Sequence, residues 1–350
     1  MNLKKNTIGI LTFHHATNPG AYLQCLALVE TLKTLGQKPE VINYINLHHL
    51  IDEWKGLLST INPKVFYNTL KRIYKFHKAR KMLPLSPLCF SKNKISNNYY
   101  DIAILGSDII WDFKNLSFGF DPVYFGRNIN TENLFSYAAS FGQIKKNEII
   151  PQEAQALLRG FNKISVRDKN SLKIIESLNI THPHLVLDPV FLYDFSSYEV
   201  PCNKSNYILV YSYLMDDIWK AELKDFANEK GLKIIAVGYS QPWCDANILE
   251  ISPFEWLGYF RNAQYVVTST FHGVIFAVKY EKQFIAFAKD GLNDKVKDMA
   301  CILHLDSRIL GGGETVMNII NENIDYKYTR DMLNSLIENS LQFLKEILRK

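Results

Sequence analysis

Short runs of β-prone apolar residues alternate along this chain with stretches in which apolar residues recur at every third or fourth position. In the first half the apolar runs lie at 8–13, 41–44, 102–105, 135–139, 164–166 and 185–187. In the second half they lie at 207–212, 233–237, 265–268 and 284–287, with helical stretches near 216–230, 253–262, 271–280 and 292–303. This alternation predicts an α/β fold in which helices cover parallel sheets.

The two series of strands are separated at 193–206 by a segment that lacks periodicity and is rich in polar turn residues. We therefore expect an N-terminal Rossmann-like domain over 1–194, a linker over 195–206, a C-terminal Rossmann-like domain over 207–330 and a terminal helix over 331–350. Two such domains facing a cleft bind ligands beyond the carboxyl ends of their strands. Site residues are therefore expected where strands pass into helices.

The composition of the 350 residues narrows the class of protein. Hydrophobic residues make up 47% and charged residues 21%, which is ordinary for a globular protein. The five cysteines are scattered and never spaced as Cys-x-x-Cys, so we expect neither a disulfide framework nor a metal site. The net charge of +5 comes without a nucleic-acid-binding signature. No apolar stretch reaches the ~18 residues of a spanning helix, and the first run lacks a signal-peptide cleavage site. We expect a cytoplasmic protein that has no nucleic-acid partner.

The first junction, at 12–28, is a strand end, a polar turn and a helix that begins near Asn18, Pro19 and Gly20. Asn is a favourable N-cap, Pro suits the first helical turn, and Gly lets a ligand approach the backbone. These residues are candidates for holding an anion, and an ordinary capped helix is an equal alternative. His14 and His15 precede them without a third ligand at metal spacing.

A second junction follows the run at 102–105, where the chain continues with Gly106, Ser107 and Asp108 and reaches Trp111. The small residues leave space for a ligand, the carboxylate can accept a sugar hydroxyl, and the indole can stack on a sugar ring. A tight turn with a buried tryptophan is an equally good interpretation.

Two further junctions of the first half lie at 136–142 and 164–171. Small residues in the former, among them Ser140, allow a ligand to approach closely. In the latter, Arg167 is a bidentate donor that suits a carboxylate or a phosphate. The structural alternative for Arg167 is a pair with the adjacent Asp168, or a helix cap.

The last junction, at 265–277, carries Ser269, Thr270, His272 and Gly273. The strand is expected to end at Ser269 and a helix to begin near His272, so that backbone amides at the helix N-terminus are open to an anion. His272 is a candidate catalytic residue. A lone histidine is more often a packing or capping residue, so the neighbouring junctions decide its interpretation.

The segment 64–82 has seven Lys or Arg residues and no acid, with apolar residues at helical spacing. A basic amphipathic helix can lie on an anionic membrane surface, which would make the protein peripheral on the inner face of the membrane. The alternative is a surface helix whose apolar stripe packs on its own domain.

In order along the chain, these junctions resemble the sequence blocks of the polysaccharide pyruvyl transferase family. The blocks lie at 18–28, 106–111 (Gly-Ser-Asp-x-x-Trp), 137–142, 165–168, 187–189 and 269–273 (Ser-Thr-Phe-His-Gly). The resemblance implies an architecture similar to the two-domain GT-B glycosyltransferases, and transfer of a pyruvyl group from phosphoenolpyruvate to a sugar as a ketal. It implies that His272 and Arg167 lie in the donor site. Lys295 stands where the family has an arginine.

Phosphoenolpyruvate carries a phosphate and a carboxylate, so its pocket needs cations and free amides, whereas a neutral sugar needs a carboxylate. The hypothesis is that Arg167, Lys295 and the amides near Gly20 and His272 hold the anions, that His272 donates a proton, and that Asp108 orients or deprotonates the sugar hydroxyl. No cofactor is expected, and the acceptor would be a bacterial-type polysaccharide or a lipid-linked oligosaccharide. The alternatives are a GT-B glycosyltransferase that uses a nucleotide sugar and a non-catalytic protein that binds glycan or phosphate.

Overall fold

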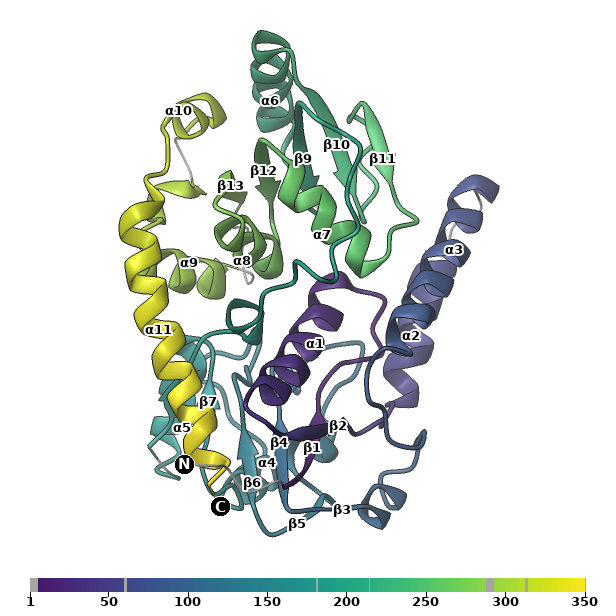
Figure 1. Ribbon diagram of the computed structural model, residues 1–350, viewed down its shortest axis with the longest axis vertical. Coiled ribbons are helices and arrows are strands. Elements are labelled where there is room, and N and C mark those ends of the chain that lie inside the picture. The colour runs from purple at the N-terminus through teal and green to yellow at the C-terminus, as the bar shows by residue number, and fades with distance from the viewer. Residues whose placement is uncertain are drawn as a thin grey trace. The chain divides into compact units, whose positions relative to one another are not determined.

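The computed structural model describes residues 6–59, 62–180, 182–213, 215–287, 293–311 and 314–349. The chain divides into two compact units, each with its own parallel sheet (Figure 1). Unit 1 comprises residues 1–59, 77–193 and 335–350, and unit 2 comprises residues 60–76 and 194–334. The units therefore differ from the expected linear domains, because 60–76 group with the second half of the chain and 335–350 with the first half.

Unit 1 is built on a four-stranded parallel sheet in the order β2-β1-β4-β6. These strands are β1 (Thr7–Leu11), β2 (Lys38–Val41), β4 (Ile102–Leu105) and β6 (Leu134–Ser136). Two short parallel pairs join β3 (Tyr99–Tyr100) to β5 (Asn130–Thr131) and β7 (Ser165–Val166) to β8 (His184–Leu185). The helices are α1 (Pro19–Thr34), α2 (Leu47–Leu58), the last residues of α3 (Pro63–Arg80), α4 (Gln152–Leu158), α5 (Lys169–Ser177) and the end of α11 (Tyr326–Ile347).

The sequence explains the central elements of unit 1. All four residues of β4 are buried, as expected for a parallel strand covered on both faces. Helix α1 is apolar nearly all round and is buried along most of its length, and the Asn18 side chain caps it by accepting from the Ala21 N–H. Strand β6 ends at Ser136, earlier than the predicted 135–139 run, because Ala138 has a positive φ of 54° that breaks the extended backbone.

Unit 2 is built on a six-stranded parallel sheet in the order β11-β10-β9-β12-β13-β14. Its strands are β9 (Tyr207–Tyr211), β10 (Lys233–Val237), β11 (Ala246–Ile248), β12 (Tyr265–Thr268), β13 (Gln283–Phe287) and β14 (Ile309–Leu310). Its helices are α6 (Asp217–Lys230), α7 (Pro253–Asn262), α8 (Phe271–Lys279), α9 (Asn293–Ile302), α10 (Val316–Asn321) and the first part of α11. Unit 2 also has the 3-10 turn η4 (Asp306–Arg308), and unit 1 has the 3-10 turns η1 (Lys94–Asn97), η2 (Pro122–Phe125) and η3 (Pro189–Leu192).

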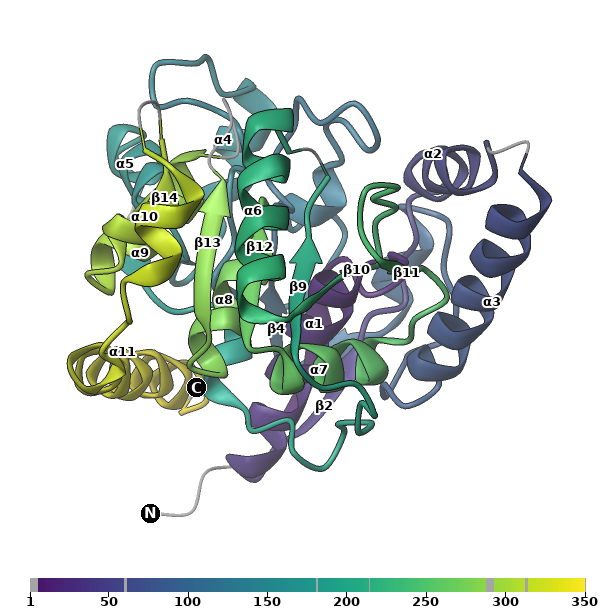
Figure 2. The same cartoon turned by 90° about the horizontal axis from the view of Figure 1, so that it is seen from above.

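Helices cover both faces of the sheet in unit 2. Apolar residues of α6 and α10 pack with Ile208 and Val210 of β9 on one face, and Figure 2 shows α6 lying beside β9 and β12. On the other face, the ring of Tyr211 packs edge-on against Trp256 of α7, which in turn meets Phe276 of α8. This is the alternation of inward and outward side chains that a doubly covered parallel sheet requires.

Helix α3 is tied to unit 2 by its polar side chains. The Arg72 guanidinium donates to the carbonyl oxygen of Gly238 at 2.7 Å, and the Lys75 ammonium forms a salt bridge with Glu255 at 2.8 Å. Among the described residues, no helix is both long and apolar enough to cross a membrane.

Candidate functional site

In unit 1 the predicted site residues gather at the carboxyl edge of the sheet, where three loops are joined by hydrogen bonds. Thr12, just after β1, donates its hydroxyl to the Ser107 carbonyl oxygen after β4 at 2.8 Å, and it accepts from the Gln24 amide at 3.0 Å. The Ser140 N–H, beyond β6, donates to the Asp108 carbonyl oxygen at 3.0 Å. The expectation that these junctions meet follows from the parallel strands.

The backbone at 106–108 is tightly constrained. A Cβ at Gly106 would lie 2.3 Å from the carbonyl oxygen of Tyr137, and its φ is +114°, so only glycine fits. Asp108 also has a positive φ, of 81°, which is uncommon for a residue with a side chain. Such conformations concentrate at functional sites, because the surrounding structure must hold them in place.

Arg167 is buried between two carboxylates. Its Nη1 donates to Asp188 Oδ2 at 2.7 Å and its Nη2 to Asp108 Oδ1 at 2.9 Å. Burial alone would lower the pKa of Arg167, but the two carboxylates outweigh it and raise that pKa. The adjacent Asp168 caps α5 by accepting from the Ser171 N–H, so it is not the salt-bridge partner that the sequence suggested. Arg167 therefore holds Asp108 and Asp188 together.

The charge of this cluster bears on which ligand it can take. Of the three ionised groups, Asp188 is fully buried, Arg167 is 3% exposed, and Asp108 reaches the surface, with 12% of its side chain exposed. One guanidinium and two carboxylates sum to a net charge of −1. Such a cluster repels an anion and offers a carboxylate oxygen to a hydroxyl group.

Other predicted residues of unit 1 have structural partners. Trp111 is completely buried, its Nε1 donates to the Tyr124 carbonyl oxygen, and its ring packs among Phe125, Phe141 and Phe161. The alternative of a buried tryptophan therefore describes it, and its faces are not exposed for a sugar ring.

The small polar residues of these loops also form hydrogen bonds within unit 1. Ser107 donates to Asp188 Oδ2 at 3.4 Å, and Ser140 accepts from the Gly142 N–H at 3.1 Å. Asn18 is the N-cap of α1, and Gly20 lies buried in its first turn. These contacts fix the loops that surround Asp108.

In unit 2, the predicted loop lies between β12 and α8, as the sequence indicated. Thr268 donates to the Tyr211 carbonyl oxygen at 2.7 Å, and the Ser269 hydroxyl accepts from Ser212 Oγ and from the Tyr213 N–H. Thr270 caps α8 by accepting from the Gly273 N–H at 3.0 Å. Four hydrogen bonds, made by three consecutive residues, thus hold this loop in one conformation.

His272 is the second residue of α8 and is half-buried, with its ring edge-on to Phe271. Gly273 directly after it leaves no space for a side chain, because a Cβ there would lie 2.0 Å from Thr268 Oγ1. The helix N-terminus and its positive partial charge therefore lie at the imidazole. Lys295, the remaining predicted donor residue, belongs to α9, and its side chain lies outside the described residues.

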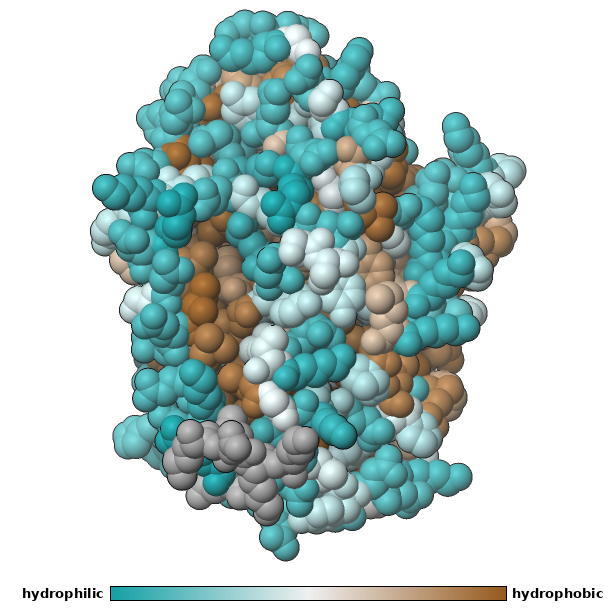
Figure 3. Space-filling model, in the orientation of Figure 1, coloured by the Kyte–Doolittle hydropathy of each residue, from teal (hydrophilic) through white to brown (hydrophobic). Residues whose placement is uncertain are grey.

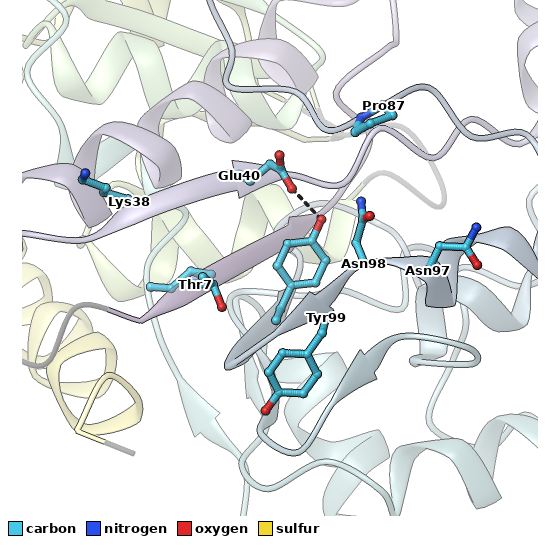
Figure 4. Close-up of a pocket in the computed structure, with 9 residues that line it drawn as sticks. Thr7, Lys38, Glu40, Pro87, Asn97, Asn98 and Tyr99 are labelled. Carbon is cyan, nitrogen blue, oxygen red and sulfur yellow. Dashed lines mark hydrogen bonds between the residues drawn. The ribbon is translucent and has the colours of Figure 1, made fainter.

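One cavity of unit 1 lies away from these residues. This cavity, shown in Figure 4, is bounded by the amino ends of β1 and β2, with Lys38, Glu40, Asn98 and Tyr99 around it, and Tyr100 donates to Glu40 at 2.7 Å. This is the edge of the sheet opposite to Asp108, and no predicted site residue lines it. Within the described part of the chain, no group of three His, Cys, Asp or Glu residues could hold a metal ion.

Sequence reasoning missed one residue of the carboxyl edge, His49 of α2. Its ring lies 5.2 Å from that of Phe13, which follows β1 at this edge of the sheet. Burial lowers the pKa of His49 to about 4, and the Asp108 carboxylate opposes that shift. The signal that could have found it is Asn46, a good N-cap whose side chain accepts from the amides of His48 and His49 at the start of an amphipathic stretch.

Two Rossmann-like units, each with residues clustered at the carboxyl ends of its strands, define a protein of the GT-B-like class. Solved structures support this fold. The UDP-GlcNAc 2-epimerase from Neisseria meningitidis aligns with a TM-score of 0.53 at 11% identity, covering 98% of this chain and 99% of that one. Arabidopsis thaliana UGT89C1 complexed with quercetin aligns with a TM-score of 0.51 at 11% identity, covering 99% of this chain and 100% of that one. At such identity the similarity shows the fold alone.

The chain belongs to the polysaccharide pyruvyl transferase family, whose model matches residues 18–291. This confirms the resemblance that the ordered junctions indicated. No curated protein matches the sequence.

Proposed function

We propose that this protein transfers the enolpyruvyl group of phosphoenolpyruvate to a sugar and closes it there as a pyruvate ketal. In that reaction the methylene carbon gains a proton, one sugar oxygen bonds to the central carbon, the bond from that carbon to the phosphate oxygen breaks, and a second sugar oxygen closes the ring. The two hydroxyls release two protons, of which one ends on the new methyl group and one on the phosphate. The reaction therefore needs no oxidant or reductant.

The observation that carries this proposal is the family match, which spans the loops of both Asp108 and His272. His272 supports a role on the donor side. It is half-buried at a helix N-terminus, where the partial positive charge favours the phosphate or carboxylate of phosphoenolpyruvate, and its neighbours hold it firmly. We assign it the proton that reaches the methylene carbon or the leaving phosphate. Ser269, Thr270 and Lys295 remain proposed donor contacts.

Unit 1 supports a role on the acceptor side. Asp108 is the member of the Arg167 cluster that reaches the surface, and its carboxylate can accept the proton of a sugar hydroxyl. The resemblance implied that Arg167 binds the donor, but its guanidinium is engaged by Asp108 and Asp188 in a cluster of net negative charge. We therefore assign Arg167 to positioning Asp108 for the acceptor.

The test is phosphate release from phosphoenolpyruvate in the presence of sugars linked to lipid diphosphates. The wild type should release phosphate only when an acceptor is present, and His272→Ala should abolish most of that release. Full activity in His272→Ala would disprove the assignment of the proton donor. Tight binding of a nucleotide sugar, without any response to phosphoenolpyruvate, would favour a glycosyltransferase instead.

We further propose that α3 binds an anionic membrane surface, so that the acceptor is a lipid-linked oligosaccharide. Tyr67, Leu70 and Tyr74 are each between 44% and 58% exposed on this helix, and the Lys71 ammonium lies 4.5 Å from the Tyr67 ring centroid. Tyrosine and lysine are residues that favour the membrane interface, and the helix has no acid. In Figure 3 brown apolar atoms lie among teal polar ones over this helix, at the right of the view.

Sedimentation with lipid vesicles tests this second proposal. The wild type should bind vesicles that contain phosphatidylserine and should not bind vesicles of phosphatidylcholine alone. Replacing Tyr67, Leu70 and Tyr74 with Ser should weaken binding, because each buried apolar side chain contributes to it. A control that replaces the exposed Lys173 and Lys224 with Gln should bind normally. Equal binding by wild type and the triple variant would remove the membrane role of α3.

A further inference from the structure

Three histidines form a row at the carboxyl end of β1. His14 and His15 follow this strand directly, and His49 comes from α2. The ring centroids of His14 and His15 are 5.6 Å apart and those of His15 and His49 are 5.0 Å apart, both pairs edge to face. Phe13 and Phe118 pack against His49 at 5.2 and 5.4 Å. The imidazoles are therefore held in fixed orientations by aromatic neighbours.

The three histidines differ in how their nitrogens are used. His14 is fully engaged, since its Nδ1 bonds with the Thr12 carbonyl oxygen and its Nε2 with Asn43 Oδ1 at 2.9 Å. His15 is 1% exposed, and neither of its ring nitrogens has a hydrogen-bond partner among the residues that the structure describes. The same holds for Nδ1 of His49. Native folds leave few buried polar atoms without partners, and each one that remains calls for an explanation, such as a functional role or a bound water, ion or ligand.

The charge state of these rings limits the kind of ligand that can form hydrogen bonds with their nitrogens. Burial, together with His14, His49 and Arg80, lowers the pKa of His15 well below its ordinary value, and burial lowers the pKa of His49 to about 4. Both rings are therefore neutral at pH 7, and each offers one N–H donor and one acceptor nitrogen. A hydroxyl group is the natural partner of such a ring, because it both donates and accepts.

The carboxylates near these rings also favour a ligand with hydroxyl groups. Asp108 and Asp52 both act on His49, and Glu53 of the same helix accepts from the Thr17 N–H in the loop after β1. The Arg80 guanidinium, which donates to the His15 carbonyl oxygen at 3.1 Å, offsets one of these three carboxylates. The remaining negative charge disfavours a phosphate and is compatible with an uncharged ligand that is rich in hydroxyls.

We propose that His15 and His49, together with Asp108, form a binding site in unit 1 for neighbouring hydroxyls of the sugar acceptor. This rests on the proposed function, and it names the residues that recognise the acceptor. His49 is half-buried and receives one hydroxyl on its unprotonated nitrogen, while its partner His15 fixes the ring behind it. Asp108 takes the proton of the hydroxyl that attacks. The histidines are binding and positioning residues.

The test uses methyl α-glycosides of glucose, galactose and mannose as probes, with binding to the full chain followed by saturation-transfer NMR. His15→Phe and His49→Phe keep an aromatic ring of similar shape and remove the nitrogens. His49→Phe should weaken binding of the glycoside that binds the wild type by about tenfold, the loss expected for one hydrogen bond. His15→Phe, which changes only the ring that packs behind His49, should weaken that binding by a smaller factor. His49→Gln restores a polar group and should recover part of the affinity. His182→Phe, an exposed histidine of the same unit, is the matched control.

Thermal unfolding of the same variants separates binding from a structural role. Among the described residues, neither ring nitrogen of His15 has a hydrogen-bond partner, and Nδ1 of His49 has none either. Both Phe variants should therefore melt at or above the wild-type temperature. Unchanged glycoside binding in both Phe variants, or no binding of any probe to the wild type, would overturn the proposal. A loss of binding that only accompanies a large drop in melting temperature would also overturn it.

Phosphate release from phosphoenolpyruvate, measured on the same proteins, tells the two proposals apart. If the wild type binds a glycoside through the histidines and never releases phosphate, the proposed function fails and this site stands. If the wild type releases phosphate and the Phe variants keep its KM for the acceptor, the site fails and the function stands.

Discussion

Replacing Arg167 with Met removes the cation that joins two carboxylates. Asp188 is completely buried and lies 2.7 Å from Arg167 Nη1, so Arg167→Met leaves a buried carboxylate without its cation. Breaking a buried ion pair in this way costs about 3–5 kcal/mol of the free energy of unfolding. A double variant that also carries Asp188→Asn removes the stranded charge and should recover about half of that loss.

The assay is urea unfolding followed by tryptophan fluorescence and by far-UV circular dichroism, whose coincidence checks whether one transition is observed. A loss of less than about 1 kcal/mol in Arg167→Met would refute the structural argument, because that is the range of an exposed salt bridge.

Kinetics of Arg167→Lys separate the two roles considered for this residue. An ammonium keeps the charge but cannot bridge Asp108 and Asp188 as the guanidinium does. If Arg167 positions Asp108, the turnover rate should fall while the KM for phosphoenolpyruvate stays within about twofold of the wild type. A rise of about tenfold or more in that KM, with turnover unchanged, would show instead that Arg167 binds the donor.

Three further outcomes are expected. His272→Ala should lower the rate of phosphate release by about 10²–10⁴-fold, the usual contribution of a general acid, and a loss below about threefold would contradict its role. Gly106→Ala should destabilise the protein by at least about 2 kcal/mol. Gly36→Ala is the control, because Gly36 also has a positive φ but no atom lies near the position of an added Cβ, and it should cost about 1 kcal/mol. Equal losses in the two variants would contradict the close contact between Gly106 and Tyr137. Lys279, half-buried at the end of α8, has a pKa lowered by burial to about 8. Its folded-state pKa lies below the unfolded value, so its charge destabilises the fold below pH 8 and this cost fades as the pH rises toward about 10. Lys279→Met should therefore raise stability at pH 7 by up to about 3 kcal/mol and by less at pH 10; a gain that does not vary with pH would contradict this origin.

The sequence predicted those strands and helices whose ends are marked by neighbouring residues in the chain. The run at 265–268 and the helix after it coincide with β12 and the start of α8, because a β-branched strand, a capping threonine and a glycine follow one another in the chain. The family match and the GT-B-like fold confirm what the ordered junctions indicated.

Partnerships between distant residues could not be predicted in the same way. Arg167 pairs with residues 21 and 59 positions away, whereas the sequence offered only the adjacent Asp168. The burial of Trp111 likewise depends on rings from three separate segments. Helix α2 was missed, and His49 with it, because the helix is short and none of its residues is fully buried, so that it carries only a short apolar stripe.

Formation of a pyruvate ketal by this chain can be followed on both products at once. The wild type is incubated with phosphoenolpyruvate and sugars linked to lipid diphosphates, and phosphate release is compared with the proton NMR spectrum of the product. We expect one phosphate for each new ketal methyl group on the sugar, and we expect His272→Ala to lose both products. No phosphate release with any acceptor, together with turnover of a nucleotide sugar, would contradict this expectation.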